Sequence, residues 1–440
     1  MNRTLLYIDP GTGSMLFTII IGAVSAGFFV LQKFKLKLKF LISGGKAEAA
    51  TANKIPYVIF SDSKRYWNVF KPVCDEFEKR GIDVEYWTMS EDDPALSEKY
   101  EHVSAKFIGE GNKAFSKLNI MNASVVLATT PGLDVLQWKR SKTVDFYVHI
   151  LHQPGDTTFY RMFGLDHYDA VLISGEYEEK QLREIEALRG IPKRETCLTG
   201  ITYLDTMKKR YEASASSGSE DSGNKGGGSA TKTVLLAPTW GETAILSRFG
   251  EKIISALVRT GYSIIIRPHP QSFESEKELM EKLQEKFPNS DKLEWNRDND
   301  NFEVLKKSDI MITDFSGVMF DYALIFDRPF IYADIEFDKS VYDAAWLDED
   351  MWTLRILPEI GIPLREEDFD NIKDVIDNAV NDTSLAVGRD KARAETWANP
   401  GEAAVRTVDY LVRKHEELTQ RETEDEDSEN VHKVEREYAI

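Results

Sequence analysis

Two histidines lie where an imidazole could take part in a reaction. His269 sits in the run Arg267-Pro-His269-Pro, and His152 directly follows an apolar stretch at residues 146–151. Proline on both sides fixes the backbone around His269 and holds its ring in one place. An arginine beside a histidine suits a diphosphate, and the histidine could also protonate a leaving oxygen. A neutral His152 could act as a general base on a hydroxyl group. For each histidine, a purely structural role in its loop is the alternative.

A metal site is the other use that clustered histidines suggest. His149, His152 and His167 fall within one short region of the chain. Residues three apart on a strand point to opposite faces, and no cysteine lies nearby to complete a zinc site. The two cysteines, Cys74 and Cys197, have neither disulfide nor metal spacing and fit a reducing compartment. We therefore expect no metal and no cofactor, with His149 structural and His152 facing a cleft.

The third candidate is the run Ile310-Met-Ile-Thr-Asp314-Phe-Ser316-Gly317-Val-Met-Phe-Asp321. Its pattern predicts a short buried strand, a turn at residues 314–317, and a helix that closes near residue 326. The start of a helix presents unpaired backbone N–H groups and the positive end of a dipole, which together suit a phosphate. An ordinary strand-to-helix connection with Ser316 as the N-cap is the alternative.

These runs follow short apolar segments that alternate with amphipathic ones. In the first half we expect strands at 57–60, 84–88, 125–127, 146–151 and 170–173, with helices at 67–80 and 133–140. In the second half we expect strands at 234–237, 263–267, 310–313 and 330–332, with helices at 250–260, 275–287 and 302–307. Such alternation indicates an α/β protein with two parallel sheets, each covered on both faces.

The candidate residues then fall at one kind of sheet edge. In doubly wound folds, ligands bind at the carboxyl ends of the strands, in the crevice that these ends border. Thr239 and Trp240 follow the expected strand at 234–237, and Arg267 and His269 follow the next one. We expect these residues to share a cleft between two domains.

The composition predicts the following division of the chain. We expect a membrane anchor with a basic segment at 1–45, a first α/β domain at 55–206, a flexible Ser/Gly linker at 207–231, a second α/β domain at 232–398, a helix at 399–414 and an acidic tail at 415–440. The linker prediction rests on a Ser/Gly-rich stretch at 214–231 that is nearly free of apolar side chains. The tail prediction rests on a run of acidic residues typical of a solvated or disordered end.

The anchor prediction rests on residues 15–31, which are uncharged and strongly apolar. Their number is at the short end of what spans a bilayer. Lysines follow at positions 33, 35, 37 and 39, so the positive-inside rule places the rest of the chain in the cytoplasm. A cleaved signal peptide is the alternative, although no small-residue cleavage site follows. We expect a single-pass protein of the cell membrane, and the formal charge of −19 argues against nucleic-acid binding.

Together these motifs resemble the CDP-glycerol glycerophosphotransferase family, the bacterial teichoic-acid glycerol- and ribitol-phosphate transferases. The resemblance covers roughly residues 55–411. The segments that carry it are Leu151-His152-Gln153, Ala237-Pro-Thr239-Trp240-Gly241, Arg267-Pro-His269-Pro and the stretch from Ser308 to Asp321, with weaker matches at 200–205 and 399–402.

The resemblance implies a GT-B arrangement of two Rossmann-like domains, in which the second holds most of the nucleotide diphosphate. It implies transfer from CDP-glycerol to a lipid-linked acceptor, whose hydroxyl attacks the β-phosphorus while CMP leaves. His152 then becomes the candidate base and His269 the second catalytic candidate. The remaining candidates bind the donor: Arg267, Thr239, Trp240, Asp314, Ser316, Gly317 and Asp321.

This chain departs from the family pattern at several positions. Gly241 replaces an arginine, Gly317 replaces the second serine of a pair, and His152 lacks the preceding Trp and the following Gly. These departures leave the donor open. A GT-B glycosyltransferase that uses a nucleotide sugar, and a degenerate nucleotide-binding or scaffold protein, remain as alternatives. The oligomeric state is also left open.

Overall fold

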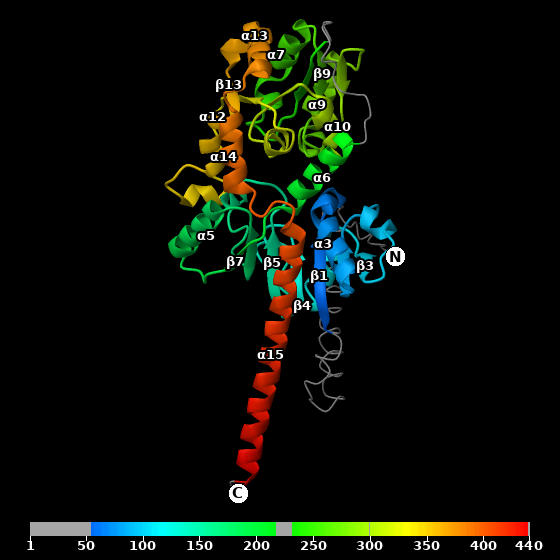
Figure 1. The fold of residues 1–440 in the computed structure, drawn as a ribbon, viewed down its shortest axis with the longest axis vertical. Helices are drawn as coiled ribbons and strands as arrows, with labels where there is room; N and C mark the ends of the chain where they lie inside the picture. Colours follow the sequence, from blue (N-terminus) through cyan, green and yellow to red (C-terminus); the bar gives the residue numbers. More distant parts are fainter. Residues whose placement is uncertain (1–53, 217–230, 299, 439–440) are drawn as a thin grey trace, which may run out of the picture. The chain divides into compact units, whose positions relative to one another are not determined.

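The computed structural model of this chain describes residues 54–216, 231–298 and 300–438 (Figure 1), and the side chains only as far as residue 424. The predicted anchor at 15–31 and the lysines that follow it lie outside the described residues. Within the described ranges, no helix combines the length and the apolar character that a bilayer crossing requires.

The first half of the described chain forms a seven-stranded parallel sheet in the order β3-β2-β1-β4-β5-β6-β7. Its strands are β1 Ile55–Ser61, β2 Val84–Thr88, β3 Val103–Phe107, β4 Asn122–Ala128, β5 Thr143–Ile150, β6 Ala170–Ile173 and β7 Glu195–Leu198. The helices that accompany it are α3 Trp67–Arg80, α4 Gly111–Leu118, α5 Glu176–Arg189 and α6 Thr202–Ser216, with 3-10 turns η1 Lys64–Tyr66, η2 Pro94–Ser97 and η3 Thr157–Phe159.

The second half forms a six-stranded parallel sheet in the order β10-β9-β8-β11-β12-β13. Its strands are β8 Thr233–Leu236, β9 Ser263–Ile266, β10 Leu293–Trp295, β11 Ile310–Thr313, β12 Phe330–Ala333 and β13 Gly361–Leu364. Its helices are α7 Ile245–Arg259, α8 Ser272–Ser275, α9 Lys277–Lys286, α10 Phe302–Lys307, α11 Val318–Phe320, α12 Trp352–Ile360, α13 Ile372–Asn381, α14 Ala386–Thr396 and α15 Ala403–Tyr438, with the π-helical turn η4 Asp321–Ile325 and the 3-10 turns η5 Asp343–Trp346 and η6 Glu366–Asn371.

Both sheets have the doubly wound order, in which the chain starts in the middle and reverses direction once. The reversal lies between β1 and β4 in the first sheet and between β8 and β11 in the second. Alternate strand residues pack on opposite faces: Val234 and Leu236 join one core cluster and Leu235 joins another. The expected pair of parallel sheets, each covered on both faces, is therefore confirmed.

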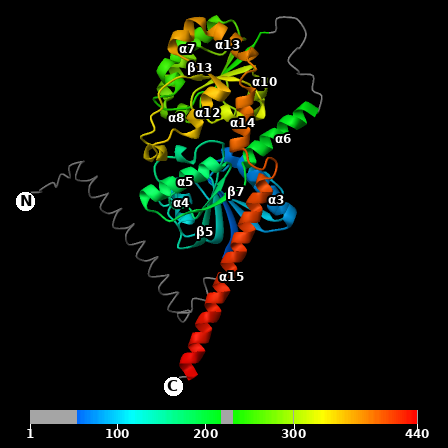
Figure 2. The ribbon, with the colours of Figure 1, turned by 60° about the vertical axis from the view of Figure 1, so that its left-hand side comes forward.

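The last helix returns to the first sheet. Val408 and Leu411 of α15 are buried in the same core cluster as the β1 residues Tyr57 and Ile59. Asp409 forms an ion pair with Arg80 of α3, 2.7 Å from its guanidinium. Figures 1 and 2 both show α15, in red, running alongside the strands of the first sheet. The chain thus passes from the first sheet to the second and back again.

Several expected elements need correction. The predicted helix at 133–140 is an irregular loop, in which Gly132 and Asp134 have positive φ values of 83° and 62° and the Asp134 N–H donates to the Trp138 carbonyl at 2.7 Å. The apolar pattern there reflects burial of Leu133 and Trp138 in the core, not a helical face. The strands β3, β7, β10 and β13 were missed. β3 and β7 are edge strands. Exposed residues alternate with less exposed ones in β3, and no residue of β7 is fully buried, so their sequences lack a continuous apolar run.

Two expected boundaries also move. Residues 207–216, assigned to the linker, continue helix α6, and residues 217–230 lie outside the described residues. Helix α15 does not end near residue 414 but continues through the acidic stretch to Tyr438. That stretch is rich in Glu, which is a good helix former, and the Arg413–Glu417 pair at 3.7 Å supports the helix where the stretch begins.

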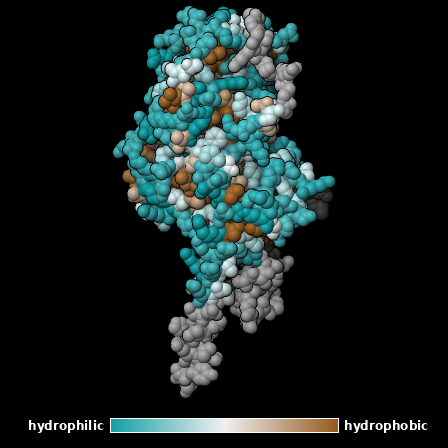
Figure 3. Space-filling model, viewed as in Figure 1, coloured by the Kyte–Doolittle hydropathy of each residue, from teal (hydrophilic) through white to brown (hydrophobic). Residues whose placement is uncertain are grey.

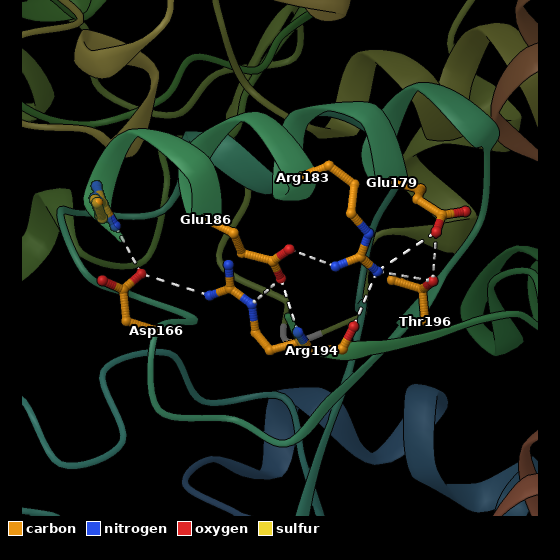
Figure 4. A network of polar contacts seen from close by, with 7 residues as sticks. Asp166, Glu179, Arg183, Glu186, Arg194 and Thr196 are labelled. Atoms are coloured by element: carbon orange, nitrogen blue, oxygen red, sulfur yellow. Dashed lines mark hydrogen bonds and ion pairs between the residues drawn. The ribbon is translucent and has the colours of Figure 1, made fainter. Parts of the chain in front are cut away.

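Hydrophilic residues cover most of the visible face (Figure 3), and some charged side chains are buried in the interior. The face in Figure 3 is mostly hydrophilic, with apolar residues scattered singly or in small groups. Figure 4 shows a polar network beside α5, in which Glu186 lies between Arg183 and Arg194. Glu186 Oε1 accepts from Arg194 Nε at 2.9 Å, and both side chains are 3% exposed. The network fixes α5 against the loop that leads into β7.

Candidate functional site

A cleft of about 220 Å³ lies at the carboxyl ends of the strands, between the loops of the two sheets. Its walls come from the segments after β1 and β5 on one side and after β8, β9 and β11 on the other. Five of the nine predicted site residues line it, namely His152, Arg267, His269, Ser316 and Asp321. The fold therefore brings these five residues together, as their predicted positions at the carboxyl ends of strands suggested, although they lie far apart in the sequence.

His152 follows β5 and is held from behind by the loop after β4. Its Nδ1 lies 3.2 Å from Thr129 Oγ1, and its ring stands edge-on to Tyr66, with 5.1 Å between ring centroids. Burial, and then the charge of Arg65, lower the pKa of His152 to about 4. The ring is therefore neutral at pH 7. With Nδ1–H donating to Thr129, the Nε2 lone pair would be available as a base.

His269 has the opposite arrangement of its ring nitrogens. Its Nδ1 accepts a hydrogen bond from the Gln271 backbone N–H at 3.1 Å. The proton of the neutral ring must therefore be on Nε2, which makes Nε2 a hydrogen-bond donor. Burial, followed by the charges of Arg65 and Arg267, lowers the pKa of His269 to about 4. His269 is thus suited to donate to a phosphate oxygen.

Two arginines supply the positive charge of the cleft. The Arg267 guanidinium is positioned by the Asn296 side chain at 2.7 Å and by the Asp298 carbonyl at 2.8 Å. Arg65, in the η1 turn after β1, is exposed and forms no ion pair with a carboxylate of the described residues. Arg65 was not among the predicted site residues, although it lies just after a strand end, as the predicted residues do.

Asp314 lies beneath the cleft, not on its surface. Its side chain is 1% exposed and accepts hydrogen bonds from the backbone N–H groups of Thr239, at 2.7 Å, and Ile245, at 3.0 Å. Burial raises the pKa of Asp314 to about 6. The carboxylate therefore ties the turn after β11 to the loop after β8 and to the start of α7. Thr239 takes part through its backbone, and a direct donor contact by either residue stays a prediction.

Trp240 and Gly317 also lie outside the cleft lining. Trp240 is 39% exposed, and its ring is tilted against that of His269 with 6.3 Å between centroids. Gly317 is covered by the side chain of Gln153 from the opposite loop. Trp240 thus supports the His269 ring, and Gly317 marks a close approach between the two walls.

Asp321 begins the π-helical turn η4 and carries an unusual carboxylate. Its Oδ2 accepts from Tyr203 Oη at 2.9 Å and from Asn301 Nδ2 at 3.0 Å. Its Oδ1 is buried and has no hydrogen-bond partner within the described part of the chain. Burial raises the pKa of Asp321 to about 7. π-Helical turns are frequent at functional sites, and this one aims a carboxylate at the cleft. Tyr203 lies within the weak family match at 200–205 but was not itself predicted as a site residue, and Asn301 had no signal in the sequence.

His149 lies outside the cleft, in the core of the first sheet. His149 is fully buried and its Nε2 lies 3.0 Å from Tyr160 Oη. In the described ranges, no three or more His, Cys, Asp or Glu side chains are grouped as metal ligands would be.

Comparison with known proteins gives one family match and several similar solved structures. Residues 150–346 match the family described as CDP-Glycerol:Poly(glycerophosphate) glycerophosphotransferase. No curated protein sequence matches the chain. Among solved structures, a variant of the wall teichoic acid polymerase TagF is similar with a TM-score of 0.54 and 16% identity, covering 88% of this chain and 98% of that one. The UDP-GlcNAc 2-epimerase of Methanocaldococcus jannaschii has a TM-score of 0.51 and 14% identity, covering 82% and 100%.

At these identities the structural likeness shows the fold, which is GT-B-like. The family match spans the segment from the end of β5 to the η5 turn and so encloses His152, His269 and the stretch from Ser308 to Asp321. On this match, the segment at residues 150–346 belongs to the CDP-glycerol:poly(glycerophosphate) glycerophosphotransferase family of enzymes.

Proposed function

We propose that this protein transfers a glycerol-phosphate unit, or a similar polyol-phosphate, from a CDP-linked donor to a lipid-linked acceptor in the synthesis of a cell-surface polymer. One observation carries the proposal. A single cleft holds a neutral histidine from the first sheet and an Arg–His pair with Ser316 from the second. A base facing a phosphate-binding wall is the arrangement that phosphoryl transfer needs, because such transfer depends on positioning and charge stabilisation.

In the proposed reaction, the acceptor hydroxyl oxygen attacks the β-phosphorus of the donor. His152 Nε2 takes the hydroxyl proton as the new O–P bond forms. The bond between the β-phosphorus and the bridging oxygen breaks, and its electron pair leaves with CMP. Arg65, Arg267 and the Nε2–H of His269 would neutralise the charge that develops on the phosphate oxygens.

His269 would then have a second part in the reaction. Its low pKa comes from burial and from two arginines, so the negative charge of a bound diphosphate would raise that pKa again. A protonated His269 could pass its proton to the bridging oxygen of the departing CMP.

We also propose that residues 15–31 anchor the protein in the cell membrane, with the remaining chain in the cytoplasm. The support is the apolar run and the lysines that follow it. An anchored enzyme would meet a lipid-linked acceptor at the bilayer face. Protease treatment of intact cells tests this topology, since digestion of residues 55–411 from outside would overturn it.

The transfer itself is tested with detergent-solubilised full-length protein, membrane lipid as acceptor, and CDP-glycerol, CDP-ribitol or UDP-sugars as donors. We expect CMP release from a CDP-polyol, reduced about a hundredfold or more in His152→Ala and in His269→Ala. His102→Ala is the matched control, because His102 is paired with Asp83 on the surface and does not line the cleft.

Two results would contradict the proposal. Release of UDP without release of CMP would indicate a nucleotide-sugar transferase. Nucleotide binding without turnover of any donor would indicate a binding or scaffold protein.

A further inference from the structure

The side chain of Gln153 fills the space that a side chain at position 317 would need. A Cβ atom built on Gly317 would lie 2.1 Å from Gln153 Oε1, 2.6 Å from its Cδ and 3.0 Å from its Nε2. These separations are far below a van der Waals contact, so the carboxamide can lie where it does only because residue 317 is glycine. Gly317 has a φ of −56°, which any residue adopts. The glycine therefore leaves room for the carboxamide in this position, and the backbone conformation does not require it.

The Gln153 carboxamide stands between two cavities. Gln153 lines the cleft that holds His152 and His269, and it also lines a smaller pocket of about 60 Å³. No hydrogen bond joins its carboxamide to another residue of the described chain, and the side chain is exposed. Its donor and its acceptor both remain available to a ligand. A hydroxyl group can accept and donate at once and so matches a carboxamide fully, whereas a phosphate oxygen can only accept.

The smaller pocket limits what can extend past Gln153. Aromatic rings form much of its wall, namely Phe159, Tyr160, Phe315 and Phe320. A volume of about 60 Å³ is room for a few water-sized groups. The hydroxymethyl end of a short polyol is of that size, and a sugar ring is larger. Ser316 lines the cleft and its neighbour Gly317 lines the smaller pocket, so a group bound beside Ser316 would lie next to this pocket.

We propose that the Gln153 carboxamide, seated in the space left by Gly317, contacts the hydroxyl groups of the donor's polyol and favours a short polyol over a longer one. The inference rests on the proposed function and concerns the same cleft. It gives the Gln153–Gly317 pair a role in donor selection, separate from the binding of the nucleotide phosphates by Arg267 and His269.

The test removes the carboxamide in two independent ways. Gln153→Ala deletes it, and Gly317→Ala pushes it aside with a Cβ while leaving Gln153 in the chain. Full-length protein is titrated with CDP-glycerol and with CDP by calorimetry, and transfer from CDP-glycerol and CDP-ribitol is measured in parallel. We expect each variant to lose about tenfold of the preference for CDP-glycerol over CDP, as one hydrogen bond would give, with CDP affinity unchanged in Gln153→Ala.

The double variant and a control sharpen the result. The pair should behave as one unit, so Gln153→Ala/Gly317→Ala should lose no more than either single variant. Gln137→Ala, at an exposed glutamine away from the cleft, should match the wild type.

The outcomes separate this inference from the proposed function. If the wild type transfers a polyol-phosphate and neither variant changes the preference between CDP-glycerol and CDP or between the two polyols, the inference is wrong and the function stands. An equal loss of affinity for CDP and CDP-glycerol would also overturn it. If the wild type transfers from neither donor, the proposed function fails. The calorimetric comparison then still decides the inference. It requires that the wild type binds CDP-glycerol more tightly than CDP and that the two variants do not.

Discussion

The cleft combines two charged arginines with two histidine rings that are neutral at pH 7. Arg65 and Arg267 stay charged, and together with burial they keep His152 and His269 neutral. A histidine that is neutral in the free enzyme is ready to accept a proton, and its hydrogen-bonding partners decide which nitrogen does so. The Gln271 N–H makes that choice for His269, and the Thr129 hydroxyl, which can donate or accept, is the partner of His152 Nδ1.

The low pKa values can be measured directly. In full-length protein labelled at histidine, NMR titration should show two rings with midpoints near 4, and these should vanish in His152→Gln and His269→Gln respectively. Both folded-state pKa values lie below the ordinary value of about 6.5, so each ring contributes stability that is present above that pH and lost as the pH falls towards 4. Midpoints near 6.5 for both rings would contradict the burial argument.

Arg65 offers a prediction that links both rings. In Arg65→Gln the pKa of His152 and that of His269 should rise, because Arg65 lowers both. The KM for the donor should rise about tenfold, as loss of a charged hydrogen-bonding group would give. Arg259→Gln is the control, since Arg259 is exposed and outside the cleft lining. A variant with an unchanged donor KM would exclude Arg65 from donor binding.

Some site residues could be predicted from their place after a strand, and others depend on contacts that only the folded chain makes. His152, Arg267 and His269 could be predicted because each directly follows an apolar strand, and parallel strands end at one edge. Tyr203 reaches Asp321 from α6, and Asn301 reaches it from the position before α10, so their approach depends on tertiary packing and no local pattern paired them with Asp321. Asp314 was predicted by position, but the direction of its carboxylate, towards Thr239 and Ile245, required the structure.

Helix α12 is tied to the His152 loop by an acidic cap. Asp156, four residues after His152, accepts from the backbone N–H groups of Trp352 at 2.7 Å and Thr353 at 2.8 Å, and it is 6% exposed. A carboxylate at a helix N-terminus satisfies N–H groups that otherwise lack partners. The cap therefore holds the loop that carries His152, at the edge of the first sheet, against an element of the second.

Removing this cap should lower stability and slow transfer together. We expect Asp156→Ala to reduce the free energy of unfolding by about 1–3 kcal/mol, because two buried N–H groups lose their acceptor. Urea unfolding measures the loss, and the CMP-release assay should show a lower kcat from the displaced His152. Glu349→Gln is the control, because the exposed Lys180–Glu349 pair should contribute under about 1 kcal/mol. Equal effects of both variants would contradict the cap.

The two-sheet architecture could be predicted from the alternation of strands and helices, and the return of the chain to the first sheet could not. The pattern of residues 399–414 indicated an amphipathic helix but not which sheet would receive its apolar face. In the structure, Val408 and Leu411 enter the core of the first sheet although they follow the whole of the second in sequence. Contacts between residues so distant in the chain leave no periodic trace.

This return should matter to the stability of the whole fold. Leu411→Ala should reduce the free energy of unfolding by about 2–4 kcal/mol, since it leaves a cavity at a side chain that is 1% exposed. Val405→Ala, on the same helix but 37% exposed, should cost far less. Denaturant unfolding compares the two variants, and equal losses would mean that α15 is only loosely attached to the first sheet.

The carboxylate of Asp321, with a pKa near 7 and one oxygen without a described partner, has a thermodynamic consequence. An anionic nucleotide that enters the cleft would draw a proton onto this group, so binding would be coupled to proton uptake from the buffer. The apparent binding enthalpy at pH 7.5 should then vary with the ionisation enthalpy of the buffer chosen. Asp321→Asn should remove part of that dependence, and the affinity of the wild type for its nucleotide should fall as the medium becomes more alkaline.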